Sequence, residues 1–117
     1  MTYKPTMRNK KRYILFEVIC ESAPSERDVR DAIYDGILKF LGEYGSSLAS
    51  PKVLEFDEKT SRGVLRCVRG EETRVKAALA LMNNLAGKKA AVRALSVSGT
   101  IKKLKGKRKA REREEGI

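Results

Sequence analysis

Apolar side chains recur at every second position, or in continuous runs, in four short stretches of the chain, and both patterns are typical of β-strands. The predicted strands are residues 12–20, 52–57, 64–69 and 88–97. In the first, RYILFEVIC, the even positions form a wholly apolar face, which predicts a central strand with one side in the core. In the second, alternation places Leu54 and Phe56 together on one face.

Two longer stretches carry apolar residues every three or four positions, which predicts amphipathic helices. Ser25 is a good N-cap for the first helix, and Gly45 is a natural stop. The predicted buried stripe of this helix is Val29, Ile33, Ile37, Leu41 and Tyr44. The stripe of the second helix, which Gly87 ends, is Val75, Leu79, Met82 and Ala86.

The predicted order of elements is β-α-β-β-α-β, which corresponds to two split βαβ units with right-handed crossovers. This order predicts an α+β, ferredoxin-like or RRM-like sandwich, in which a four-stranded antiparallel sheet carries two helices on one face. We expect a single domain over residues 1–104 with a basic N-terminal arm. Residues 105–117 form a basic extension that we expect to be disordered, or helical only on RNA.

The positive charge of the chain is concentrated at its two ends. The formal net charge is +11. Residues 1–12 carry five Lys or Arg and no acid, and residues 87–117 carry eleven against three acids, whereas residues 13–86 carry ten against twelve. Basic ends of this kind indicate a polyanionic partner, most often nucleic acid. A pair of solvated tails is the simpler alternative.

These basic segments come together in the predicted fold. The first and fourth strands are antiparallel neighbours in a ferredoxin-like sheet, so residues 8–12 and 98–103 meet at one edge. Gly99 lets the backbone approach a phosphate closely, and Thr100 is placed to cap a following helix whose N-terminus favours an anion. An ordinary strand-to-helix turn is the alternative. The predicted RNA-binding residues are Arg8, Lys10, Lys11, Arg12, Lys88, Lys89, Arg93, Ser98, Gly99, Thr100, Lys102 and Lys103.

Catalysis by the chain itself is not indicated. The sequence has no histidine, no Gly-x-Ser-x-Gly motif and no phosphate-binding loop. Glu17 and Glu55 share the open sheet face, but Arg66 on that face balances them more simply than an acid–base pair would. Cys20 and Cys67 point into the core, where we expect two free thiols close to one another, because two cysteines without histidine make no zinc site. We therefore predict neither catalytic nor metal-binding residues.

The open face of the predicted sheet lacks the aromatic platform on which RRM domains stack bases. Val64, Arg66 and Val68 stand where aromatic residues are needed. A mixed apolar and charged face suits contact with another protein, unless the C-terminal tail folds back over it. The predicted partner-binding residues are Tyr13, Leu15, Ile19, Val64 and Val68.

Several segments of the chain resemble a known family. PTMRNKKRYILFEVI and RALSVSGTIKKL are similar to the two ends of archaeal ribonuclease P protein component 2, and VLEFDEKTSRGVLRCVR and AALALM fit its middle. The resemblance covers about residues 3–104. It implies the same RRM-like sandwich. It also implies RNA contact at these positions of the matching motifs: Arg8, Lys10, Lys11, Arg12, Ser98, Gly99 and Thr100.

The resemblance implies a function as well. Ribonuclease P is the RNA-based endoribonuclease that removes the 5′ leader from precursor tRNA, and its RNA subunit is the catalyst, using magnesium. A member of this family is implied to be a non-catalytic subunit that binds and supports the catalytic RNA. Its implied protein partner is ribonuclease P protein component 3. No cofactor bound by the protein itself is implied.

Two other functions are open from the residues alone. One is a general RNA- or ribosome-associated binding protein, which predicts little preference among RNAs. The other is a regulatory ferredoxin-like domain, which predicts stabilisation by a small effector and has no need of basic ends. A cytoplasmic location is expected, because no apolar stretch is long enough to cross a membrane, no signal peptide is recognised, and two cysteines fit a reducing compartment.

Overall fold

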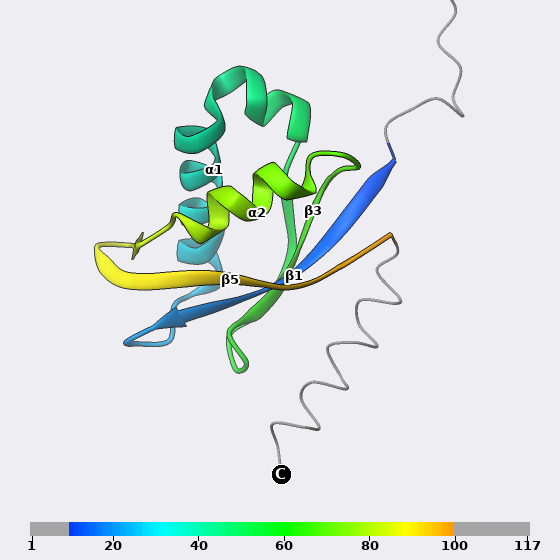
Figure 1. The fold of residues 1–117 in the computed structure, drawn as a ribbon. Coiled ribbons are helices and arrows are strands. Elements are labelled where there is room, and N and C mark those ends of the chain that lie inside the picture. Colours follow the sequence, from blue (N-terminus) through cyan, green and yellow to red (C-terminus); the bar gives the residue numbers. More distant parts are fainter. Residues whose placement is uncertain (1–9, 100–117) are drawn as a thin grey trace, which may run out of the picture.

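The computed structural model describes residues 10–99 (Figure 1). Its elements are β1 (Lys11–Cys20), α1 (Glu26–Ala49), β2 (Lys52–Asp57), β3 (Arg62–Val68), α2 (Glu72–Ala80), β4 (Asn84–Leu85) and β5 (Lys88–Ser98). The predictions for Arg8, Thr100, Lys102 and Lys103, and for the boundary after residue 104, lie outside the described residues. Within residues 10–99, no helix is both long and apolar enough to cross a membrane.

The strands form one antiparallel sheet in the order β2-β3-β1-β5-β4. Figure 1 shows α1 and α2 on the same side of this sheet. The predicted α+β architecture, with both helices on one face and β1 in the middle of the sheet, is therefore confirmed. The predicted count of four strands is wrong, because the sheet of the described residues has five.

The additional strand, β4, occupies the end of the predicted second helix. α2 stops at Ala80, and β4 then pairs with the first two residues of β5. The loop between them, Ala86–Gly87, has φ angles of 53° and 82°, and two positive φ angles are what a type I′ hairpin turn requires. Leu85 is buried in the core, whereas Ala86, which the helical stripe placed there, is exposed.

The core lies between the sheet and the two helices. The even positions of β1 point into it, as predicted, and the rings of Phe16 and Phe56 stack there with centroids 6.2 Å apart. The helices contribute fully buried side chains: Val29, Ile33, Ile37, Val75 and Leu79. Burial of each such side chain contributes about 2 kcal/mol, so apolar packing is the main force that holds the helices on the sheet.

Helix α1 is broken at Gly42, which has non-helical angles (φ 75°, ψ 177°). A positive φ costs glycine little but costs other residues about 1 kcal/mol or more. The helix resumes after this residue and ends at Ala49, so the predicted stop at Gly45 is wrong. Because the break changes the direction of the helix, residues after Gly42 no longer continue the buried stripe. Tyr44, which was predicted in that stripe, is 80% exposed.

Strand β2 contains a β-bulge at Leu54, where its pairing with β3 shifts register. A bulge places two residues opposite one and interrupts the alternation of side chains. Val53 and Phe56 therefore both point into the core, while Leu54 lies on the opposite face beside Leu15 and Val64. The predicted placement of Leu54 and Phe56 on one face is wrong for this reason.

The two cysteines are free and lie far apart. Cys67 is paired in register with Arg12 at the start of β1, whereas Cys20 ends that strand. The distance along β1 is roughly 26 Å at the rise of a β-strand, so the expectation that the thiols are close is wrong. Burial raises the pKa of the Cys67 thiol to about 11, with smaller contributions from Glu72 and Glu71. The thiol therefore stays protonated and unreactive at neutral pH.

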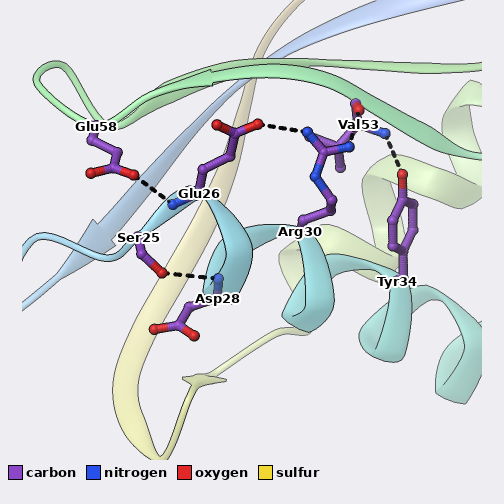
Figure 2. A network of polar contacts seen from close by, with 7 residues as sticks. All are labelled: Ser25, Glu26, Asp28, Arg30, Tyr34, Val53 and Glu58. Atoms are coloured by element: carbon purple, nitrogen blue, oxygen red, sulfur yellow. Dashed lines mark hydrogen bonds and ion pairs between the residues drawn. The ribbon is translucent and has the colours of Figure 1, made fainter.

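The start of α1 is capped by two side chains from different parts of the chain (Figure 2). The Oγ of Ser25 accepts a hydrogen bond from the backbone N–H of Asp28 at 3.1 Å, which confirms the predicted N-cap. A carboxylate oxygen of Glu58, in the turn between β2 and β3, accepts from the N–H of Glu26 at 2.8 Å. Two of the N–H groups that a helix leaves unpaired at its start are thereby satisfied.

The next turn of α1 is tied to β2 through the backbone of Val53 (Figure 2). The guanidinium of Arg30 donates to the carbonyl of Val53 at 2.9 Å and to the carboxylate of Glu26 at 2.6 Å. The hydrogen bond to Glu26 raises the pKa of Arg30, which stays charged. The N–H of Val53 donates to the hydroxyl oxygen of Tyr34 at 2.8 Å. Both backbone groups of Val53, next to the bulge, are therefore paired with α1.

Replacing Ser25 with alanine is expected to lower the free energy of unfolding by about 1 kcal/mol, because the N–H of Asp28 loses its capping oxygen. Urea titration followed by circular dichroism measures this change. Ser47→Ala, at an exposed position inside α1, is the control and should change stability by less than about 0.5 kcal/mol. Equal stability of the two variants would show that the cap contributes nothing.

Candidate nucleic-acid interface

The start of β1 and the end of β5 meet at one end of the sheet. Tyr13 is paired in register with Ser98, so Arg12 and Gly99 continue the two strands side by side. An ideal Cβ on Gly99 would lie 2.6 Å from Nη1 of Arg12, so the guanidinium lies against the glycine backbone. The predicted meeting of these two segments is confirmed for the residues that the structure describes.

The end of β3 and the start of β2 bring further cations to this place, and these were not among the predicted residues. The backbone N–H of Arg69 donates to the carbonyl of Lys10 at 2.7 Å. Arg66 is paired in register with Tyr13, and Lys52 with Arg66. Arg66 and Arg69 could have been predicted, because antiparallel pairing of the first and third strands places the end of one beside the start of the other. We name this surface the basic corner; it consists of Lys10, Lys11, Arg12, Lys52, Arg66, Arg69, Ser98 and Gly99.

Two acids lie next to the basic corner, at the start of α2, and both are engaged locally. A carboxylate oxygen of Glu72 accepts from the N–H of Gly70 at 2.8 Å, and Glu71 lies 3.5 Å from Nη1 of Arg74. Lys10, Lys52 and Arg69 are exposed, and the other cations of the corner are half-buried. Exposed cations clustered at one end of a sheet attract phosphate groups and release the counterions bound to them.

The other predicted RNA-binding cations among residues 10–99 are not part of the basic corner. Lys88 and Lys89 start β5, roughly 33 Å from Ser98 at the rise of a strand. The ammonium of Lys88 donates to the hydroxyl of Ser22 at 2.7 Å. Arg93 lies in the middle of β5. The structure therefore separates the described members of the predicted set into the basic corner, the hairpin end of β5, and one arginine between them.

The open face of the sheet is organised around the carboxylate of Glu17. Arg62 and Arg93 are its register partners on the two neighbouring strands, at 3.2 Å and 2.6 Å. The expected balancing role of Arg66 is therefore wrong for Glu17, because Arg66 pairs in register with Tyr13 instead. The side chain of Arg62 is 3% exposed and that of Arg93 is 61% exposed. Glu17 thus neutralises a buried cation on one side and orients an exposed cation on the other.

The residues predicted to bind a protein partner differ in exposure. Leu15 and Val64 are fully buried in a small cluster on this face, packed with Tyr13, Leu54 and Leu95. Val68 is also buried, and Tyr13 is half-buried. Ile19, at 52%, is the most exposed of the five. Their role in partner binding stays a prediction, with Ile19 and Tyr13 the two that offer surface.

Charge neutralisation is the chemistry that the basic corner offers most directly. Within residues 10–99, no three His, Cys, Asp or Glu side chains gather as a metal site needs. The carboxylate of Glu17 is held in ion pairs, and the Cys67 thiol is protonated and buried. Clustered cations of this kind attract a polyanion electrostatically.

Comparison with known proteins gives relatives over most of the chain. The Rpp14/Pop5 family matches residues 12–108. Ribonuclease P protein component 2 of Pyrococcus furiosus is 43% identical over 106 residues, which cover 91% of this chain and 88% of that protein. The protein of the same name from Methanocaldococcus jannaschii is 38% identical over 104 residues, which cover 89% and 76%.

A solved structure shares the fold. A chain in the cryo-EM structure of yeast ribonuclease MRP is similar to this one with a TM-score of 0.63, covering 94% of this chain and 95% of that chain. Its sequence identity is 13%, so the likeness concerns the fold alone. The α+β sandwich described above is therefore also found in a chain of yeast ribonuclease MRP.

Proposed function

This chain belongs to the Rpp14/Pop5 family, and we infer from this that it is a protein subunit of ribonuclease P, the RNA-based endoribonuclease that removes the 5′ leader from precursor tRNA. The observation that carries the conclusion is the identity of 43% to ribonuclease P protein component 2 of Pyrococcus furiosus across 91% of the chain. The absence of histidine and the basic corner agree with a subunit that binds RNA and leaves catalysis to it.

We propose that the basic corner contacts phosphate groups of the ribonuclease P RNA. Support comes from Gly99, whose lack of a side chain lets the guanidinium of Arg12 lie against the strand backbone and holds its charge at this end of the sheet. Arg8, Thr100, Lys102 and Lys103 belong to the same proposal through the sequence. Lys88, Lys89 and Arg93 lie apart from the corner and are proposed as separate contacts on the same RNA.

The RNA is proposed to be the catalyst, with magnesium as its ion, and this chain to lower the magnesium concentration that the enzyme needs. Each neutralised phosphate removes repulsion that magnesium would otherwise have to offset. The protein partner is proposed to be ribonuclease P protein component 3, with precursor tRNA as the substrate of the whole enzyme. The cytoplasm is the proposed location.

The test is cleavage of precursor tRNA by ribonuclease P RNA at limiting magnesium, with component 3, in the presence and absence of this chain. We expect cleavage to require the chain. Equal cleavage without it, while circular dichroism shows the chain to be folded, would contradict the assignment and leave a general RNA-binding protein as the alternative.

Replacing Gly99 with alanine is expected to weaken binding to ribonuclease P RNA about threefold to tenfold. The new Cβ displaces the guanidinium of Arg12, which is the mobile end of a side chain, so stability should change by less than about 0.5 kcal/mol. Filter binding measures the affinity. In an Arg12→Ala background, Gly99→Ala should have no further effect. A full effect in that background would show that Gly99 does not act through Arg12.

A further inference from the structure

A groove of about 680 Å³ lies between α1 and the segment that runs from the end of α2 to β4. Three large apolar side chains line it: Phe40 of α1, and Leu81 and Met82 after α2. Phe40 is 46% exposed and Leu81 is 62% exposed. Apolar side chains gathered in a groove with a polar rim mark an interaction site more often than single exposed ones do.

The groove is hollow because the residues where the helices approach are small. Ala32 and Gly36 of α1 and Ala78 of α2 line it. Met82 packs against Gly36, where an added Cβ would lie 2.9 Å from its Cγ. The helices can therefore come close at this point, while the larger side chains along the groove stay exposed. The shape follows from the small residues of both helices.

The rim of the groove is acidic, in a chain whose net charge is +11. Asp28, Asp31 and Asp35 line it from α1, spaced so that they share one side of the helix. Lys39 also lines it, and its ammonium pairs with Asp35 at 3.0 Å. Figure 2 shows the carboxylate of Asp28 pointing away from Arg30, on the other side of the helix. Asp28 and Asp31 are therefore exposed carboxylates, and among the described residues neither has an ion pair with a residue of the groove.

We propose that this groove is the docking site for an amphipathic helix of another protein subunit of the same enzyme, with apolar side chains against Phe40 and Leu81 and with Lys or Arg against Asp28 and Asp31. This proposal rests on the proposed function, because it assumes an assembly with a second protein. An amphipathic helix that lays its apolar face in a groove is a common mode of recognition. Charge complementarity sets which helices fit.

RNA does not suit this groove, because three carboxylates repel phosphate. The groove also lies away from the basic corner: it begins in the first turns of α1, which follow the end of β1, whereas the corner lies at the start of β1. The molecule would then hold RNA at one end of its sheet and a basic protein helix on the helical side toward the other end.

Site-specific cross-linking in reconstituted ribonuclease P identifies the occupant. A photoreactive benzoylphenylalanine replaces Phe40, and the matched control replaces Tyr44, which is on the same helix but outside the groove. We expect a cross-link from position 40 to a Lys- and Arg-rich helix of a protein subunit, and none to that helix from position 44. A cross-link to RNA or to a second copy of this chain, or no cross-link from position 40, would overturn the proposal.

Two substitutions test the chemistry of the groove with the same assembly. Asp31→Lys and Leu81→Ser should each weaken binding of the cross-linked subunit about tenfold. Both positions are exposed, so folding is not at risk. Glu43→Lys and Leu48→Ser, also exposed on α1 but outside the groove, should have no effect. Equal effects in both pairs would overturn the proposal. If instead cleavage does not depend on the unaltered chain at all, the proposed function has failed rather than the groove.

Discussion

Replacing Glu17 with alanine should lower the free energy of unfolding by about 3 kcal/mol, because it removes the carboxylate that faces a buried guanidinium. Glu17 lies 3.2 Å from Arg62, whose side chain is 3% exposed. Removing one partner of a buried ion pair leaves an uncompensated charge in a medium of low polarity, which costs about 3–5 kcal/mol. Arg62 has further interactions, so the lower end of that range applies. Urea or thermal unfolding measures the change.

The ion pair between Glu17 and Arg93 provides the matched control. Arg93 lies 2.6 Å from Glu17, but its side chain is 61% exposed. An exposed ion pair contributes at most about 1 kcal/mol, so Arg93→Ala should destabilise the chain far less than Glu17→Ala. If both substitutions cost the same, the buried position of Arg62 does not determine the stability of this face.

Replacing Lys10, Lys11 and Arg12 together with alanine should weaken binding to ribonuclease P RNA about a hundredfold at low salt, if each cation contacts one phosphate. The slope of log affinity against log salt should become shallower by about one for each phosphate that is no longer neutralised. Nitrocellulose filter binding over a range of salt concentrations gives both quantities. All three residues lie at the start of β1, and the core positions of that strand are unchanged.

A second triple variant controls for the loss of charge alone. Arg27, Lys59 and Lys76 are exposed and lie outside the basic corner. Their replacement by alanine removes the same formal charge and should leave the salt slope unchanged. A slope that falls equally in both variants would mean that the RNA responds to net charge and not to the corner.

The parts of the fold that could be predicted from the sequence are those governed by regular periodicity. The even face of β1, the stripe of α1 as far as Ile37, and the Ser25 cap all follow from repeated local rules. Two errors of local geometry arose where one residue changes the backbone. Gly42 interrupts α1, and the bulge at Leu54 shifts the pairing of β2. Leucine gives no signal of a bulge, and the sequence offers two glycines close together, Gly42 and Gly45, at either of which a helix can break.

The candidate site was predictable as far as strand order determined it. Antiparallel neighbours bring the start of β1 to the end of β5, so Arg12 and Gly99 were placed together correctly. The same reasoning applied to β3 would have placed Arg69 beside Lys10, because the end of β3 lies next to the start of β1. The sequence of β3 was instead used only to show that aromatic residues are missing. The acidic groove was not predictable, because aspartates on the outer side of a helix have the pattern of an ordinary solvated face. Its depth depends on how closely two helices pack.

The most direct test of this account is the magnesium dependence of precursor-tRNA cleavage by the reconstituted enzyme, measured with three forms of the chain. These are the unaltered chain, the basic-corner triple variant and the control triple variant. The account predicts that the corner variant shifts the magnesium requirement to higher concentration, while the control variant follows the unaltered chain. Identical magnesium curves for all three would contradict the claim that this subunit supports the RNA through its basic corner.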